Sequence, residues 1–110
     1  MISLKDFEKI DIRVGTIVDS SFNDKSNKPC IILIIDFGTK IGLKKTSAQL
    51  TKNYNPDELI GKQIAAVINF PPKQIGKMIS QILVLGFPDD NNEPILVLPS
   101  KKVANGGKLF

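Results

Sequence analysis

The chain has 110 residues, of which 42% are hydrophobic and 6% aromatic, and its formal net charge is +4. This length is typical of one globular domain with its own core. The longest apolar run, Cys30 to Ile35, is far too short to cross a bilayer, so no membrane insertion is expected. The single cysteine excludes an internal disulfide and favours a reducing, cytoplasmic environment.

Positive charge is concentrated in the middle of the sequence. Residues 40–81 carry seven lysines against only Asp57 and Glu58, whereas the rest of the chain holds eight basic and nine acidic side chains. Such an excess favours an anionic partner. A solvated lysine surface without a charged partner is the alternative, because lysines also keep a domain soluble.

The first predicted elements are a short helix and a long strand. Ser3 and Asp6 have the spacing of a capping box, which predicts a helix that ends near residue 10. From residue 11 to residue 22 apolar side chains alternate with others, which indicates a strand. Gly15 inside this strand suggests a bulge or a sharp bend.

A polar loop, a second strand and a second helical turn are predicted next. Residues 23–29 are polar, and residues 30–38 are apolar at nearly every position, which is typical of a strand covered on both faces. Thr46 or Ser47 can cap a short helix that ends near Tyr54.

The rest of the sequence predicts one more helix and three strands. Residues 55–60 combine an N-terminal asparagine, a proline and two acids, the pattern of a helix start. Strands are expected over 62–70, 78–87 and 93–100, separated by turn-rich segments. The whole indicates one all-β domain over residues 1–110. We expect a five-stranded β-barrel of the OB-fold, with a short N-terminal helix and a helix between the third and fourth strands.

The residues that most enzymes need are scarce. The chain has no histidine, and Cys30 lies inside an apolar strand, where it is expected to be a core residue. Asp89 and Asp90 fall in a turn, and Ser47 and Ser80 have no base to activate them. A binding protein without catalysis, metal or cofactor is therefore predicted.

The segment "NFPPKQIG", residues 69–76, ends the strand before it because proline cannot donate to a β-ladder. Residues that precede proline stay extended, so Phe70 and Pro71 form a stiff apolar ridge beside Lys73 and Lys77. A rigid ridge loses little entropy on binding an extended ligand. The alternative is a plain strand terminator whose Phe70 packs inward.

Three segments, "DFEKIDIRVGTI", "IDFGTKIGLKKTSAQLT" and "VINFPPKQIGKMISQILVLG", resemble the CsaA-type secretion chaperones. These are small dimeric members of the tRNA-binding OB-domain family, which is also appended to some aminoacyl-tRNA synthetases. The resemblance extends from Asp6 to Gly107. Synthetase-appended domains usually carry a His-Pro loop where this chain has "NDKSNKP", and a glycine where it has Ile82, so the chaperone branch is favoured.

The resemblance implies a dimeric protein-export chaperone that binds unfolded preproteins or peptides and has tRNA-binding capacity. The apolar segments "CIILII" and "ILVL" also favour a homodimer, unless the chain's own helices cover them. One alternative is a structure-selective tRNA-binding protein that acts as a cofactor to aminoacyl-tRNA synthetases. Another is a dimeric scaffold for a folded protein.

The matching motifs also imply a ligand surface with two sides. Lysines there would attract phosphates or acidic peptide stretches, and the polar residues would exchange hydrogen bonds with the ligand. Ser47 could instead serve as a helix cap. One side comprises Lys44, Lys45, Ser47 and Gln49, and the other Asn69, Phe70, Pro72, Lys73 and Ser80.

Overall fold

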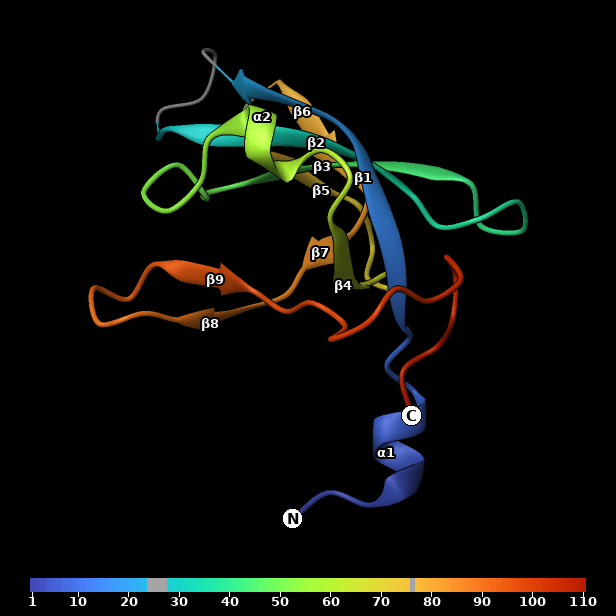
Figure 1. Cartoon of the computed structure of the whole chain (residues 1–110). Coiled ribbons are helices and arrows are strands. Elements are labelled where there is room, and N and C mark those ends of the chain that lie inside the picture. The colour runs from blue at the N-terminus through green and yellow to red at the C-terminus, as the bar shows by residue number, and fades with distance from the viewer. Residues whose placement is uncertain (24–27, 76) are drawn as a thin grey trace.

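A curled, five-stranded antiparallel sheet forms the body of the protein (Figure 1). The computed structural model describes residues 1–23, 28–75 and 77–110. The strands follow the order β3-β2-β1-β4-β7 across the sheet. Their bounds are β1 Ile12–Asn23, β2 Cys30–Asp36, β3 Leu43–Ala48, β4 Gln63–Val67 and β7 Leu83–Val84.

Two hairpins and two short helices complete the fold. The hairpins are β5 Lys73–Ile75 with β6 Met78–Ser80, and β8 Gly86–Pro88 with β9 Pro94–Leu96. Helix α1 spans Leu4–Glu8, and α2 spans Pro56–Leu59 between β3 and β4. In Figure 1 α1 extends from one end of the sheet beside the C-terminus, and the β8–β9 hairpin projects to one side. The curled sheet and the position of α2 confirm the predicted OB-fold.

The edge strand β3 is joined to the segment that follows β6, which curls the sheet toward a barrel. The Gln81 N–H donates to the Lys45 carbonyl at 2.9 Å, and the Gln81 side-chain oxygen accepts from the Lys45 N–H at 2.8 Å. The Thr46 hydroxyl donates to the Ile82 carbonyl at 3.1 Å. These bonds satisfy backbone groups that an open edge would leave unpaired.

The helix starts lie where the sequence predicts them. The Ser3 hydroxyl accepts from the Asp6 N–H at 3.2 Å, and the Asp6 carboxylate accepts from the Ser3 N–H at 3.0 Å, which is a complete capping box. At α2 the Glu58 carboxylate accepts from the Asn55 N–H at 2.7 Å. Both helices are therefore closed at the N-terminal end by their own acidic side chains.

The prediction of a helix from Thr46 or Ser47 to Tyr54 is wrong. Thr46 and Ser47 lie in β3, opposite Leu33 and Ile32 of β2. Pairing along β2 outweighs the capping preference of these two residues, since a capping preference is worth little against tertiary contacts. Only a turn remains before Tyr54, whose N–H donates to the Leu50 carbonyl at 3.0 Å.

The strands in the second half of the chain are shorter and more numerous than the sequence predicts. The strand predicted over 78–87 is divided into β6, β7 and β8, because the chain leaves one sheet and enters another. The strand predicted over 62–70 ends at Val67. Residues 73–75, taken as part of a connecting segment, form β5 by pairing with β6. Of the predicted polar loop, residues 24–27 lie outside the described residues.

The core is centred on β2 and its neighbours. Ile31, Leu33 and Ile35 are fully buried, whereas Ile32 and Ile34 are half-buried, so the outer face of β2 is only partly covered. Gly15 of β1 lies against this layer: a Cβ there would approach the Ile35 side chain to 2.7 Å. The bulge that Gly15 suggested occurs two residues later, between Ile17 and Asp19.

Within the described residues no helix is long and apolar enough to cross a membrane.

Candidate functional site

A cleft of about 600 Å³ opens between β3 and the segments that follow β4. Its walls come from β3, from Phe70 and Pro71, from the β5–β6 hairpin, from residues 82–86, and from the turn and second strand of the β8–β9 hairpin. This volume is within the range of ligand sites in proteins. The cleft therefore has the size for a few side chains of a bound polymer.

The lining of the cleft is mainly apolar and carries balanced charge. Among the described residues that line it, only Lys73 and Glu93 are charged. The charges of the cleft therefore favour neither cations nor anions of a ligand, and apolar contact is expected to dominate the binding energy. The apolar lining residues are Cys30, Ala48, Leu50, Phe70, Pro71, Ile75, Ile82, Leu83, Val84, Leu85, Pro94 and Leu96.

Phe70 is an exposed apolar residue of the cleft rim. It is 51% exposed, although it lines the cleft together with Pro71, and Leu83, which also lines the cleft, is 49% exposed. The sequence left open whether Phe70 packs inward, and the structure excludes that alternative. Because Pro71 follows it, the backbone at Phe70 is restricted to extended conformations, which limits the directions that the ring can take.

Ser47 and Ser80 face each other across the closed edge of the sheet. The Ser80 hydroxyl accepts from the buried Ser47 N–H at 2.9 Å. The Ser47 side chain is only 8% exposed, and its hydroxyl has no hydrogen-bond partner among the described residues. Both residues line the cleft, so the sequence prediction that they share one surface agrees with their positions.

Replacement by alanine should lower the stability of the protein at Ser80 but not at Ser47. Ser80→Ala leaves the buried Ser47 N–H without an acceptor, which should lower the free energy of unfolding by about 1–3 kcal/mol. Ser47→Ala removes a hydroxyl that has no partner, so the free energy of unfolding should be unchanged or slightly higher. Urea denaturation of both variants measures the difference, and equal destabilisation by the two would contradict this assignment.

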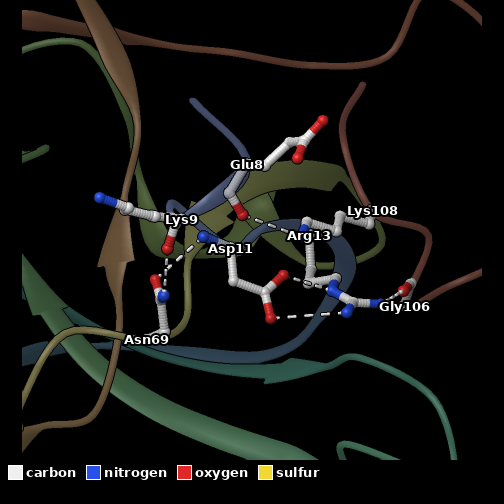
Figure 2. A network of polar contacts seen from close by, with 7 residues as sticks. All are labelled: Glu8, Lys9, Asp11, Arg13, Asn69, Gly106 and Lys108. Atoms are coloured by element: carbon white, nitrogen blue, oxygen red, sulfur yellow. Dashed lines mark hydrogen bonds and ion pairs between the residues drawn. The ribbon is translucent and has the colours of Figure 1, made fainter. Parts of the chain in front are cut away.

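Asn69 is hydrogen-bonded to the segment that joins α1 to β1 (Figure 2). Its side-chain oxygen accepts from the Asp11 N–H at 3.0 Å, and its amide donates to the Lys9 carbonyl at 2.7 Å. The Asp11 carboxylate in turn binds Arg13 Nε at 2.6 Å. Asn69 is not among the residues that line the cleft. It extends the β1–β4 pairing by one step and so positions Phe70, the next residue.

Three other residues of the predicted ligand surface lie away from the cleft. Lys44 and Lys45 are neighbours in β3, and Lys45 borders a separate hollow with Lys77. Pro72 is exposed and does not line the cleft. The structure thus brings together five of the nine predicted residues, and ligand contact by any of the nine stays a prediction. The five are Ser47, Gln49, Phe70, Lys73 and Ser80.

Asp89 closes the turn of the β8–β9 hairpin and joins it to Asn53, which follows β3. Its carboxylate accepts from the Glu93 N–H at 2.9 Å, from the Asn91 N–H at 2.8 Å and from the Asn53 amide at 3.0 Å. The bonds from Glu93 and Asn53 contribute most to holding the pKa of Asp89 below its ordinary value. Because Glu93 and Pro94 line the cleft, this exposed network anchors one cleft wall.

Acid should loosen this hairpin. A carboxylate with a lowered pKa in the folded state stabilises the fold above the ordinary aspartate pKa of about 4 and loses that contribution as the pH falls through its folded value. Thermal unfolding between pH 5 and about 2 should therefore show a smaller pH-dependent loss for Asp89→Asn than for the wild type. Asp90→Asn is the control for removing one negative charge, and a response of Asp89→Asn equal to the wild type would contradict the prediction.

The sequence did not identify most of the apolar cleft wall. Ile75, Val84 and Leu96 line it, but each lies in a strand of two or three residues that sequence periodicity cannot resolve. Glu93 was also missed, since it follows a turn-rich acidic segment. The signal that could have indicated Val84 and Leu96 is the pair of apolar runs around residues 82–85 and 95–98. Each run contains more apolar residues than one buried face of a strand requires.

Comparison with known proteins defines the family. The fold belongs to the class of OB-fold binding domains, and residues 12–108 match the family described as "Putative tRNA binding domain". The chain belongs to this family.

Curated relatives with this domain include methionine–tRNA ligases. The enzyme of Porphyromonas gingivalis is 32% identical over 98% of this chain, and that of Methanococcoides burtonii is 35% identical over 96%. The chain spans only about 15% of the length of these relatives.

Solved structures include two chaperones that match from end to end. The CsaA chaperone of Bacillus anthracis is 42% identical with a TM-score of 0.93, covering 100% of this chain and 99% of its own. The CsaA chaperone of Picrophilus torridus is 48% identical with a TM-score of 0.92 and full coverage of both chains. A MetRS-related protein of Pyrococcus horikoshii, at 23% identity and a TM-score of 0.88 over 100% of this chain and 98% of its own, shares the fold. The expected resemblance to CsaA-type proteins is confirmed.

Proposed function

We propose that this protein is a CsaA-type chaperone of the cytoplasm that binds unfolded segments of preproteins in the cleft, assists their export and retains tRNA-binding capacity. The observation that carries the proposal is the cleft itself, which is lined by apolar side chains with one cation and one anion. An unfolded segment exposes apolar side chains, and these fit such a surface. The end-to-end likeness to two CsaA chaperones supports the same reading.

Salt dependence tests this proposal. Unfolded peptides with apolar residues should bind with an affinity that changes little between about 0.05 and 0.3 M salt, because apolar burial is weakly screened. Fluorescence anisotropy of a labelled, preprotein-derived peptide measures this, with a peptide of equal length made only of polar residues as the control. Absence of binding by both peptides, together with tight binding of folded tRNA, would contradict the chaperone assignment.

The proposal includes a homodimer that uses the surface around α1. None of the residues of α1 is buried, and Ile2 and Leu4 are 76% and 72% exposed. Leu109, from the adjacent C-terminal segment, is 50% exposed. A helix of five residues gains little stability by itself, so a second copy that covers these side chains would supply it. Light scattering should give the mass of two chains, and the mass of one chain would contradict this part.

The second candidate is a structure-selective tRNA-binding protein that acts as a cofactor to aminoacyl-tRNA synthetases. It is favoured by membership of the tRNA-binding domain family and by the similarity to a segment of methionine–tRNA ligases. Such a protein should bind folded tRNA with an affinity that falls steeply with salt. It should not bind unfolded peptides, which separates the two candidates in the same titration.

A further inference from the structure

A basic hollow lies apart from the cleft and shares no lining residue with it. It has a volume of about 500 Å³, and its walls include Lys62, Lys101 and Lys102 but, among the residues that the structure describes, no acidic side chain. Within the described residues none of these three lysines takes part in an ion pair. The positive charge of this surface is therefore not neutralised by the chain around it.

The lysines of the hollow are carried by a backbone that is fixed in place. The Gln63 side chain makes two bonds to Val103, accepting from its N–H at 3.0 Å and donating to its carbonyl at 2.6 Å. The Gln63 amide also donates to the Asn105 side chain at 3.0 Å, and the Thr16 hydroxyl bonds the same oxygen at 2.8 Å. The segment that carries Lys101 and Lys102 is thus attached to β1 and β4. The backbone positions of the two lysines are therefore well defined.

The chemistry of the hollow differs from that of the cleft. In the cleft Lys73 is accompanied by Glu93, whereas the hollow adds the hydroxyl of Ser100 to three lysines; the Thr16 hydroxyl, which also lines it, already donates to Asn105. Hydroxyl donors and uncompensated ammonium groups together suit phosphate oxygens, which carry negative charge and accept hydrogen bonds.

A second pair of lysines is the nearest competitor. Lys45 and Lys77 border another hollow, but Ile32, Met78 and Ile79 share it, and the side chain of Ile79 is 54% exposed. Leu98 and Pro99 likewise line the first hollow, so apolar neighbours do not distinguish the two. The hollow of Lys62, Lys101 and Lys102 is the better phosphate surface because it brings together three lysines, against two in the other.

We infer that the hollow formed by Lys62, Lys101 and Lys102 binds the phosphodiester backbone of folded RNA, separately from the peptide cleft. The inference rests on the tRNA-binding capacity included in the proposed function. Its consequence is that RNA and an unfolded peptide bind the same protein at the same time. The RNA then neither blocks the cleft nor competes for Phe70.

Two variants with equal loss of charge test the inference. Lys101 and Lys102 are exposed, so Lys101→Gln with Lys102→Gln should fold normally, and Lys45→Gln with Lys77→Gln is the matched control. Binding of folded tRNA to each is measured between about 0.05 and 0.3 M salt. The first variant should bind about tenfold more weakly at about 0.1 M salt, with a log–log salt slope less steep by about 2, and should bind peptide like the wild type.

The outcomes separate this inference from the proposed function. A larger loss of tRNA affinity in the Lys45–Lys77 variant, or no loss in the Lys101–Lys102 variant, would overturn the assignment of the hollow and leave peptide binding untouched. A wild-type protein that binds no tRNA at low salt would overturn both the hollow and the tRNA-binding part of the proposed function. Saturating peptide should leave the tRNA affinity of the wild type unchanged, and competition between the two would contradict separate sites.

Discussion

Replacement of Gly106 by alanine is expected to lower the free energy of unfolding by about 3 kcal/mol, because two costs act together. Gly106 has a φ of +92°, a conformation that residues with a Cβ adopt only at a cost. An added Cβ would also lie 2.5 Å from the Phe37 carbonyl oxygen, a backbone atom that cannot turn aside. The Gly106 N–H and carbonyl bond Val14 and Arg13, so the whole C-terminal segment would shift.

The neighbouring glycine provides a matched control. A Cβ on Gly107 would meet no atom closer than 3.7 Å outside its chain neighbours, so Gly107→Ala should change the stability by less than about 1 kcal/mol. Urea denaturation of both variants compares the same chemical change at adjacent positions. Equal stability of the two variants would show that the C-terminal segment is not packed against Phe37 as described.

Replacement of Phe70 by alanine is expected to weaken the binding of unfolded peptides about tenfold or more, since a peptide in the cleft would cover the exposed part of Phe70 and large aromatic residues often carry much of a binding energy. The fold should lose little stability, because Phe70 is already 51% exposed to water. Peptide anisotropy and thermal unfolding of the same preparation measure the two effects separately.

Phe87 is the control for an exposed phenylalanine outside the cleft. It is 69% exposed on β8 and does not line the cleft, so Phe87→Ala should leave peptide affinity unchanged. If Phe87→Ala weakens peptide binding as much as Phe70→Ala does, the ligand binds exposed apolar residues without preference for the cleft.

Local signals in the sequence were sufficient for the helices and the first strands. The capping box at Ser3 and the proline after Asn55 act within a few residues, so they predict both helix starts without knowledge of the fold. The apolar alternation of β1 and the apolar run of β2 likewise identify long strands that form the centre of the sheet.

Elements that depend on distant partners were not predictable in this way. Thr46 and Ser47 carry the local signal of a helix cap, and only the pairing of β3 with β2 makes them strand residues. The division of residues 78–87 into three strands depends on which sheet each part joins. Tertiary context decides such cases.

The candidate site was predicted in part for the same reason. The two prolines after Phe70 act locally, so the sequence indicates a stiff ridge there, but it cannot tell which side chains lie opposite. Asn69 illustrates the limit, because its bonds to Lys9 and Asp11 join residues about 60 positions apart. The lysines are distributed over several surfaces, which a count of charges along the chain does not show.

Chemical-shift mapping of the isotopically labelled protein with a preprotein-derived unfolded peptide tests the role of the cleft most directly. The largest amide shifts are expected at Ser47, Ile75, Ser80 and Val84, in the walls on both sides of Phe70. Residues around Lys101 and Lys102 should not respond to the peptide. Shifts confined to the basic hollow or to the exposed face of α1, with the cleft unchanged, would contradict the account.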